Sequence, residues 1–190
     1  MAVAFKEWAL VCEALGRGDQ SVILRKGGIA EGRSGFGFDH PEFYLFPTWY
    51  HGQSGKVRVP GAVLPAGDPE RVTLSHVVSV EWSGRIADLE TVRRLEPLHV
   101  LDRGLIEERF VYDTGSGSLG GTGINAAFVR VRRIEPAVTL PMRREFAGCR
   151  SWIEIPEIGG NGGEAPVPVL AEDEHARRRR LFCEILGIRI

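Results

Sequence analysis

The sequence predicts an α+β fold, a single domain with a mixed or antiparallel curved sheet and flanking helices. Three observations lead to this prediction. Residues 72–82 form a long run in which apolar and polar side chains alternate, as in a half-buried strand. Apolar residues recur at helical spacing near both ends of the chain, in 4–15 and in 171–186. Strands and helices do not alternate regularly, which argues against a doubly wound parallel sheet.

Other segments with the composition of strands are short and bounded by turn residues. We expect the first two of them to pair, because a Lys-Gly-Gly turn follows the first. The Gly- and Pro-rich stretch 52–70 is predicted to be a loop with a short strand at KVRV. The predicted strands are SVILR (21–25), FYLF (43–46), AAFVRVRRI (126–134) and RSWIEI (150–155).

The helices are predicted from spacing and from their end signals. In 4–15 the residues Phe5, Trp8 and Leu15 share one face, and Gly16 is expected to end that helix. Ser83 is expected to cap a helix that stops before Pro97, and a short helix should follow Asp102.

The domain organisation follows from composition. We predict a core α+β domain over 1–156, a Gly/Pro-rich linker over 157–170, and a C-terminal helix over 171–190 that packs on the core. The glycine-rich stretch 114–123 is expected to be a mobile loop.

Charge and cysteine content bound the class of protein. The net charge of −1 over 190 residues excludes a globally basic nucleic-acid binder but not a local basic groove. Cys12, Cys149 and Cys183 are far apart and odd in number, so free thiols in a reducing cytoplasm are expected. The N-terminal run carries Lys6 and Glu7, which predicts neither a signal peptide nor a membrane span.

Ionisable residues are concentrated in residues 24–51, between two apolar runs where a hairpin need only turn. This concentration makes the stretch the candidate site of the protein. Among the polar and charged residues in it are Arg25, Lys26, Glu31, Arg33, Asp39, His40, Thr48 and His51.

Lys26 followed by Gly27 and Gly28 indicates an anion-binding turn. Consecutive glycines let the backbone take positive φ, and the exposed N–H groups of such a turn form a nest for an anion. Arg25 and Lys26 would add charge-assisted hydrogen bonds to a phosphate.

Glu31, His40 and His51 leave other chemistries open. Two histidines and a carboxylate can hold a metal, or act as general acid and base in a small nuclease-like hydrolase. No HxH or HExxH spacing is present, so the sequence predicts no metal site, and it indicates no particular cofactor. The structural alternative is a polar turn whose charges are solvated.

Three other features have structural interpretations. GSGSLG (115–120) matches the G-x-G-x-x-G pattern of dinucleotide-binding sites, but a strand-like segment rather than a helix follows it, so it does not predict such a site. The run Arg177–Arg180 is interpreted as a solvated helix face, with a phosphate patch as the alternative. His76 lies on the apolar face of 72–82 and is interpreted as a hydrogen-bonded core histidine.

Several stretches together resemble a microbial family known as a domain of unknown function, family 1802. The resemblance extends from about Ala4 to Ile155. It is carried by KEWA (6–9), LRKGGI (24–29), H-x-x-F-x-L-F-P-T-x-x-H (40–51), RF (109–110), VRVRRIEPAVTLP (129–141) and GCRSWIEI (148–155).

The resemblance implies an association with restriction-type nuclease domains, and hence with nucleic acid. The residues that it marks are Lys26, Gly27, Gly28, Glu31, His40, Thr48, His51, Arg109, Arg150 and Trp152. The second half is also loosely similar to PUA-like barrel domains, which implies a curved barrel. Arg130 and Arg132 on one face of the strand 126–134 suit a basic surface above a core.

We therefore predict a cytoplasmic binding module for nucleic acid or a nucleotide-like anion, with no membrane association. Glu31, His40 and His51 are the catalytic candidates of the alternative, a nuclease-like hydrolase; a protein-interaction domain without chemistry is the second alternative. The sequence leaves the oligomeric state open. The predicted ligand-binding residues are Arg25, Lys26, Gly27, Gly28, Thr48, Arg109, Arg130 and Arg150.

Overall fold

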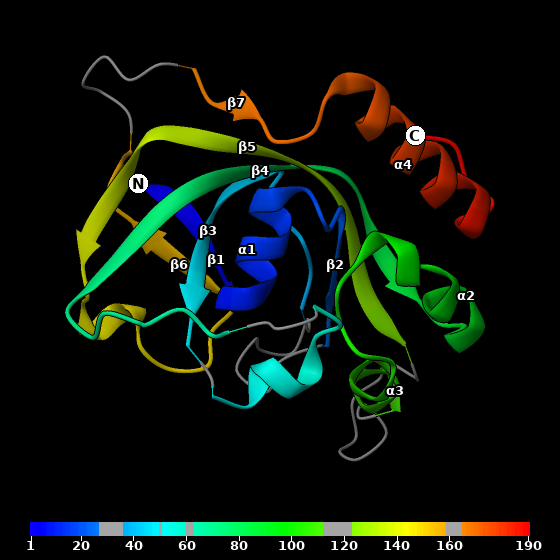
Figure 1. Cartoon of the computed structure of the whole chain (residues 1–190), viewed down its shortest axis with the longest axis horizontal. Coiled ribbons are helices and arrows are strands. Elements are labelled where there is room, and N and C mark those ends of the chain that lie inside the picture. The colour runs from blue at the N-terminus through cyan, green and yellow to red at the C-terminus, as the bar shows by residue number, and fades with distance from the viewer. Residues whose placement is uncertain (27–35, 50, 60–62, 112–122, 159–164) are drawn as a thin grey trace.

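Two long antiparallel strands, β4 (Arg71–Ile86) and β5 (Ile124–Pro141), form the centre of a curled sheet (Figure 1). The protein is described from a computed structural model, which describes residues 1–26, 36–49, 51–59, 63–111, 123–158 and 165–190. Irregularities between Leu74 and His76 and between Val80 and Trp82 shift the register of β4 against β5. Such bulges increase local twist, and the two strands arch over the N-terminal part of the chain.

The sheet is mixed, as predicted. Its strands are ordered β2-β5-β4-β3-β1-β6, with β7 paired to β5; β1 and β3 are parallel and the other pairs antiparallel. The other strands are β1 (Ala2–Trp8), β2 (Val22–Arg25), β3 (Glu42–Thr48), β6 (Trp152–Ile155) and β7 (Val167–Pro168).

Helices flank the sheet on both sides. In Figure 1, α1 lies under the arch of β4 and β5, while α2 and α4 lie outside it. The helices are α1 (Ala9–Arg17), α2 (Leu89–Arg94), α3 (Arg103–Val111) and α4 (Glu172–Leu186), with 3-10 turns η1 (His51–Lys56), η2 (Glu96–Leu98) and η4 (Arg144–Phe146). None of the helices formed by the described residues is both long and apolar enough to cross a membrane.

The first predicted helix is wrong in its first half. Residues 2–8 form β1, which inserts between β3 and β6, and the helix begins only at Ala9. Gly16 does not end this helix; Gly18 does, with a left-handed φ of 79°. Gly16 is instead a packing residue, since a Cβ there would lie 2.4 Å from His76 Cε1.

The predicted pairing of 21–25 with 43–46 is also wrong. Both segments are strands, but β2 pairs with β5, and β3 lies between β4 and β1. Ser83 does not cap a helix because β4 continues to Ile86, and the side chain of Asp88 caps α2 by accepting from Thr91 N at 2.8 Å. The KVRV segment makes only a single bridge, from Val57 to Leu101.

The main core joins both layers of helices to the sheet. Phe128 of β5 and Phe182 of α4 have ring centroids 5.0 Å apart, and Phe182 is fully buried. Val11 and Leu15 place α1 in the same cluster, and Val92 and Ile106 do so for α2 and α3. All three cysteines are free; Cys12 is buried and Cys149 is exposed.

A buried histidine stabilises the connection between α2 and α3. His99 is 5% exposed; its Nδ1 accepts from Leu101 N at 3.1 Å, and its carbonyl oxygen accepts from Arg58 Nη2 at 2.6 Å. Burial, with the positive charges of Arg58 and Arg109, lowers the pKa of His99 to about 3. The imidazole is therefore neutral in the folded protein at neutral pH.

We expect His99 to make the protein sensitive to acid. Because its pKa rises from about 3 to its ordinary 6.5 on unfolding, only the unfolded chain takes up this proton between those values. The free energy of unfolding should then fall by about 1.4 kcal/mol per pH unit between pH 6 and 4. His99→Asn, whose Oδ1 can accept from Leu101 N, should lack this component in urea titrations at each pH. Parallel pH profiles for the two proteins would contradict the assignment.

Candidate functional site

The two edges of the sheet meet at one point, and that point lies at the start of the charged stretch predicted from the sequence. β2 and β6 stand at opposite ends of the strand order, yet Arg25 Nη2 at the end of β2 lies 3.3 Å from the hydroxyl of Ser151, just before β6. Arg25 Nη1 lies 3.5 Å from Glu7 Oε1 in β1. We call the contact among Glu7, Arg25 and Ser151 the seam. It nearly closes the half-barrel.

Glu7 is the acidic centre of the seam. Its side chain is 2% exposed, and Oε1 also accepts from the backbone N–H of Trp8 at 2.7 Å. A carboxylate removed from water requires compensating positive charge and hydrogen bonds. Arg25, whose side chain is 22% exposed, supplies the charge, and the N–H of Trp8 supplies a hydrogen bond.

Arg109 brings a second guanidinium from α3. Its Nη1 donates to the carbonyl oxygen of Leu24 at 2.8 Å, and its Cζ lies 4.8 Å from the centroid of the Trp8 ring. Burial lowers its pKa, the charge of Glu7 raises it, and that of Arg25 lowers it, which shows that the three groups share one electrostatic environment.

Lys6 approaches the same region from the other face of β1. Its Nζ donates to the carbonyl oxygens of Phe146 and Gly148 at 2.8 and 2.6 Å, which ties the segment before β6 to β1. Burial lowers the pKa of Lys6, and the positive charge of Arg25 lowers it further. Among the described residues, Lys6, Arg25 and Arg109 thus lie near the buried carboxylate of Glu7, and the charge of Glu108 also acts on Arg109.

Aromatic rings from β1, from β6 and from the residues before β3 pack beside the seam. Trp152 lies 4.8 Å from Phe5 and stacks at 7° to Phe36, and its indole N–H donates to the carbonyl of Gly37 at 3.1 Å. His40 meets Trp152 edge-on with centroids 4.8 Å apart. The guanidinium of Arg25 lies 5.4 Å from the Phe5 centroid. The seam therefore combines cationic groups with flat rings.

The predicted ligand-binding residues have different surroundings. Arg25 and Arg109 lie at the seam, Lys26 follows Arg25 directly, and Gly27 and Gly28 lie outside the described residues. Arg150 is exposed next to Ser151 and makes no hydrogen bond or ion pair with any residue that the structure describes. The Thr48 hydroxyl donates to the Glu7 carbonyl at 2.9 Å, which is a structural contact.

The three catalytic candidates do not assemble within the described part of the chain. His40 precedes β3, whereas His51 follows it in η1 and is exposed, so a strand about 20 Å long separates the two histidines. Glu31 lies outside the described residues. No cluster of three or more His, Cys, Asp or Glu residues in the described ranges could hold a metal ion.

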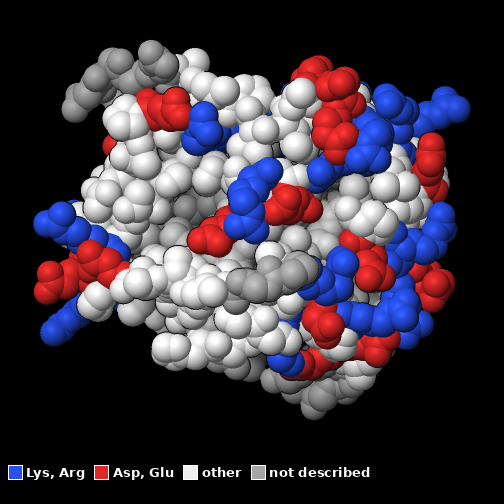
Figure 2. Space-filling model, in the orientation of Figure 1, with Lys and Arg blue, Asp and Glu red and all other residues white. Residues whose placement is uncertain are grey.

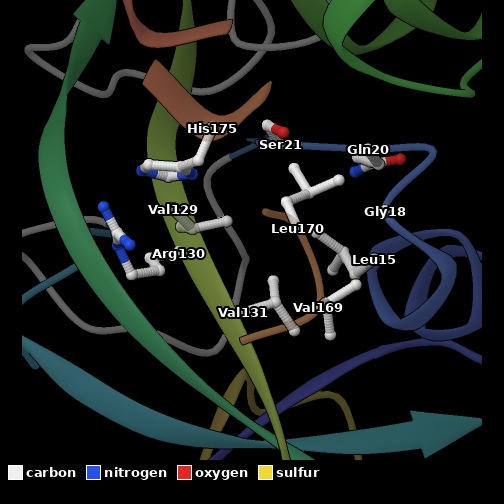
Figure 3. Close-up of a pocket in the computed structure, with 10 residues that line it drawn as sticks. All are labelled: Leu15, Gly18, Gln20, Ser21, Val129, Arg130, Val131, Val169, Leu170 and His175. Atoms are coloured by element: carbon white, nitrogen blue, oxygen red, sulfur yellow. The ribbon is translucent and has the colours of Figure 1, made fainter. Parts of the chain in front are cut away.

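Arg130 does not lie at the seam. Along β5 it is five residues from Asn125, the partner of Arg25, a separation of about 16 Å. Its guanidinium pairs with Glu81 at 3.0 Å and with Glu172 of α4 at 2.6 Å. Figure 3 shows it beside His175, which shares Glu81 through a 2.9 Å contact. Arg130 therefore anchors α4 to the sheet. The adjoining pocket, about 10 Å³, holds at most one water molecule.

The surface in Figure 2 has no continuous basic area. Lys and Arg lie mainly towards the side of α2, α3 and α4, interleaved with Asp and Glu, and the rest is largely uncharged. In the Arg177–Arg180 run, Arg177 and Arg178 both pair with Glu174 at 2.7 Å, consistent with a solvated, neutralised face. The face in Figure 2 therefore offers an anion no extended basic surface.

Sequence reasoning missed the polar residues that organise the seam. Glu7 and Ser151 were not candidates, and neither was Gln53, which is fully buried and joins Leu10 N to the carbonyl of Thr48 at 3.0 and 3.2 Å. The sequence feature that could have identified Glu7 as a buried residue is its position in a largely apolar segment, AVAFKEW. That signal indicates a buried carboxylate only if the segment is known to be a strand.

Glu7 can be tested as the charge that holds the seam. Glu7→Gln keeps the volume and the acceptor for Trp8 N but leaves Arg25 and Arg109 without the counter-charge. We expect a loss of about 2 kcal/mol in the free energy of unfolding, measured by urea denaturation at pH 7. Glu13→Gln, which removes an exposed carboxylate 3.5 Å from Arg17, should cost less than about 0.5 kcal/mol. Equal losses in the two variants would show that the Glu7 charge is not required.

Comparison with known proteins confirms the family resemblance. The model of the family described as "Domain of unknown function (DUF1802)" matches residues 4–180, so the chain belongs to this family. No curated protein matches the chain. The α+β fold with its curled half-barrel sheet and flanking helices is the predicted one.

Solved structures that match the chain do so at low similarity. ASCH from Zymomonas mobilis is 12% identical, with a TM-score of 0.46 over 93% of this chain and 92% of that one. A serine-to-alanine mutant of ZmASCH from the same organism is 13% identical, with a TM-score of 0.47 over 82% of this chain and 89% of that one. Similarity at this level assigns no residue roles.

Proposed function

We propose that this member of the DUF1802 family binds nucleic acid or a nucleotide-like anion at the seam. A phosphate group would meet the guanidinium of Arg25. Arg150 and Lys26, which adjoin Ser151 and Arg25 in the sequence, would extend the positive rim. Arg109 and Lys6 would add positive electrostatic potential without contacting the anion, since both already donate hydrogen bonds to backbone carbonyls.

The environment of Arg25 carries the proposal. A guanidinium has five N–H donors, and the two contacts of Arg25 at the seam are long, 3.3 and 3.5 Å. As far as the described residues go, donors of Arg25 therefore remain for a phosphate, which arginine binds in bidentate fashion. Lys6, Arg25 and Arg109 together carry more positive charge than Glu7 and Glu108 offset. In a half-buried place this excess favours an anion, because the interaction there is less screened than at an open surface.

The rings next to the seam favour an anion that carries bases. His40 and Trp152 lie at the seam, and His40 is half-buried, with its ring in contact only on part of its surface. Bases stack on such rings with little dependence on sequence. A nucleotide whose phosphate meets Arg25 could place its base near His40. This combination supports nucleic acid over inorganic phosphate.

The alternatives have less support. The hydrolase would need His40 and His51 together, and β3 separates them. A protein-interaction domain would present a broad apolar area, whereas the large exposed apolar residues of the described chain come from separate segments: Met1, Val63, Val111, Val167 and Ile190.

The proposal is tested by the salt dependence of binding. Fluorescence anisotropy with labelled 20-nucleotide single-stranded RNA and DNA should show an affinity that falls as salt rises, because phosphate contacts release counterions. Arg150→Ala and Arg25→Lys should each weaken binding at low salt. Arg150→Ala should also reduce the slope of log K against log salt by roughly 1.

Arg17→Ala is the matched control. Arg17 is an exposed arginine of α1, paired with Glu13 and Asp19 and not part of the seam. Its loss should leave affinity and slope nearly unchanged. If Arg17→Ala and Arg150→Ala weaken binding equally, or if wild-type affinity is independent of salt, the seam is not the binding site.

A further inference from the structure

The arginines along β5 do not extend the positive charge of the seam. Arg130 pairs with Glu81 and with Glu172. Arg132, on the same face of the strand, pairs with Glu42. Two arginines there meet three carboxylates, so a nucleic-acid strand that lay along β5 would gain no net electrostatic attraction.

The seam, by contrast, concentrates positive charge. Two described carboxylates act on it: Glu7, and Glu108, which is also paired with Lys56 at 2.9 Å. Five cations lie at the seam or adjoin it in the sequence: Lys6, Arg25, Lys26, Arg109 and Arg150. The two carboxylates therefore leave an excess of positive charge in a small space.

Arg25 is the point at which an anion can approach this charge. Lys6 and Arg109 are each 9% exposed and donate to backbone carbonyls, whereas the side chain of Arg25 is 22% exposed. The next arginine along β5, Arg130, lies about 16 Å along the strand from the partner of Arg25 and is already paired. The described residues thus offer an anion one partly buried contact with a short rim, and no continuous path.

A phosphate at the end of a chain fits such a place better than one within the chain. At pH 7 a phosphomonoester carries about 1.5 to 2 negative charges and three free oxygens, whereas each phosphate within a strand carries one charge. The attraction to a fixed positive charge rises in proportion to the charge of the anion. A guanidinium binds two oxygens in bidentate fashion, and a terminal phosphate still presents a third oxygen to Arg150 or Lys26.

We propose that the seam binds one terminal phosphate together with its nucleoside, as found at a phosphorylated strand end or in a free mononucleotide, and does not follow the backbone of a strand. This inference rests on the proposed binding at the seam and specifies its ligand. The terminal phosphate would contact Arg25, its base would lie near His40, and the remainder of a longer strand would extend into solvent.

Strand ends are compared by fluorescence anisotropy with an internally labelled 20-nucleotide RNA that carries a 5′-phosphate, a 3′-phosphate or hydroxyls at both ends. At low salt one phosphorylated form should bind about tenfold more tightly than the hydroxyl form, because hydrogen bonds to charged groups are the strong ones. A phosphorylated five-nucleotide RNA should bind within about threefold of the 20-nucleotide RNA, since the distal nucleotides make no phosphate contacts.

Competition distinguishes the two sources of a terminal phosphate, and either result supports the proposal. Adenosine monophosphate should displace the labelled RNA as well as a phosphorylated five-nucleotide RNA does if free mononucleotides are the ligand, and much more weakly if strand ends are. Inorganic phosphate should compete about tenfold more weakly than the better of the two, because it lacks a base that can stack. Equal competition by inorganic phosphate would contradict the role of the nucleoside.

Two arginine variants locate the effect, with folding checked by urea denaturation. Arg25→Lys keeps the charge but loses the planar fork, so it should reduce the preference for the phosphorylated end to less than about threefold. Arg132→Gln is the matched control, because a strand that followed β5 would pass Arg132. It should leave both the affinity and the preference within about twofold of wild type, since no phosphate contact is lost.

The same measurements separate this inference from the proposed function. Equal affinity for phosphorylated and hydroxyl ends would overturn the inference, while salt-dependent binding that Arg150→Ala weakens would still support the proposed function. Absence of salt-dependent binding by every probe would contradict the proposed function itself.

Discussion

The structure depends on the ion pair between Glu7 and Arg25, because this pair joins the first and last portions of a sheet whose edges would otherwise be open. Arg25 ends β2, Glu7 lies in β1, and Ser151 precedes β6. Unpaired strand edges are templates for association with other chains, and closing a sheet is one way to remove them. A long polar side chain can bridge the gap here because the backbones of β2 and β6 do not pair. Because a side chain makes this bridge, the positive charge of Arg25 remains partly exposed to solvent.

Closure of this kind connects stability with the proposed function. A buried carboxylate with more than one neighbouring cation is stable only while the cations stay close, so Glu7 holds Arg25 and Arg109 in position. The guanidinium of Arg25 is then pre-organised, so the proposed binding of an anion would cost little further conformational entropy. The surrounding rings, Phe5 and Trp152, exclude water from one side and strengthen the field.

The sequence by itself determined where most strands and helices lie. Residues 21–25, 43–46 and 72–82 are strands, and α3 and α4 follow their predicted starts, because alternation, helical spacing and turn residues act over a few positions. The sequence also directed attention to Arg25 and to the stretch that follows it. These signals are local, and the secondary structure they predict forms when no long-range contact favours another structure.

Tertiary structure decided the pairing and therefore the site. AVAFKEW has apolar spacing compatible with a helix, but an open position between β3 and β6 makes it a strand, and only then does Glu7 become a buried carboxylate. β2 joins β5 rather than β3, since strand partners are chosen by burial across the whole sheet and not by sequence order. For the same reason Arg130 faces α4 and Arg25 faces Ser151. Which charged side chains lie close together depends on contacts between residues far apart in the sequence, so no short stretch of the sequence predicts it.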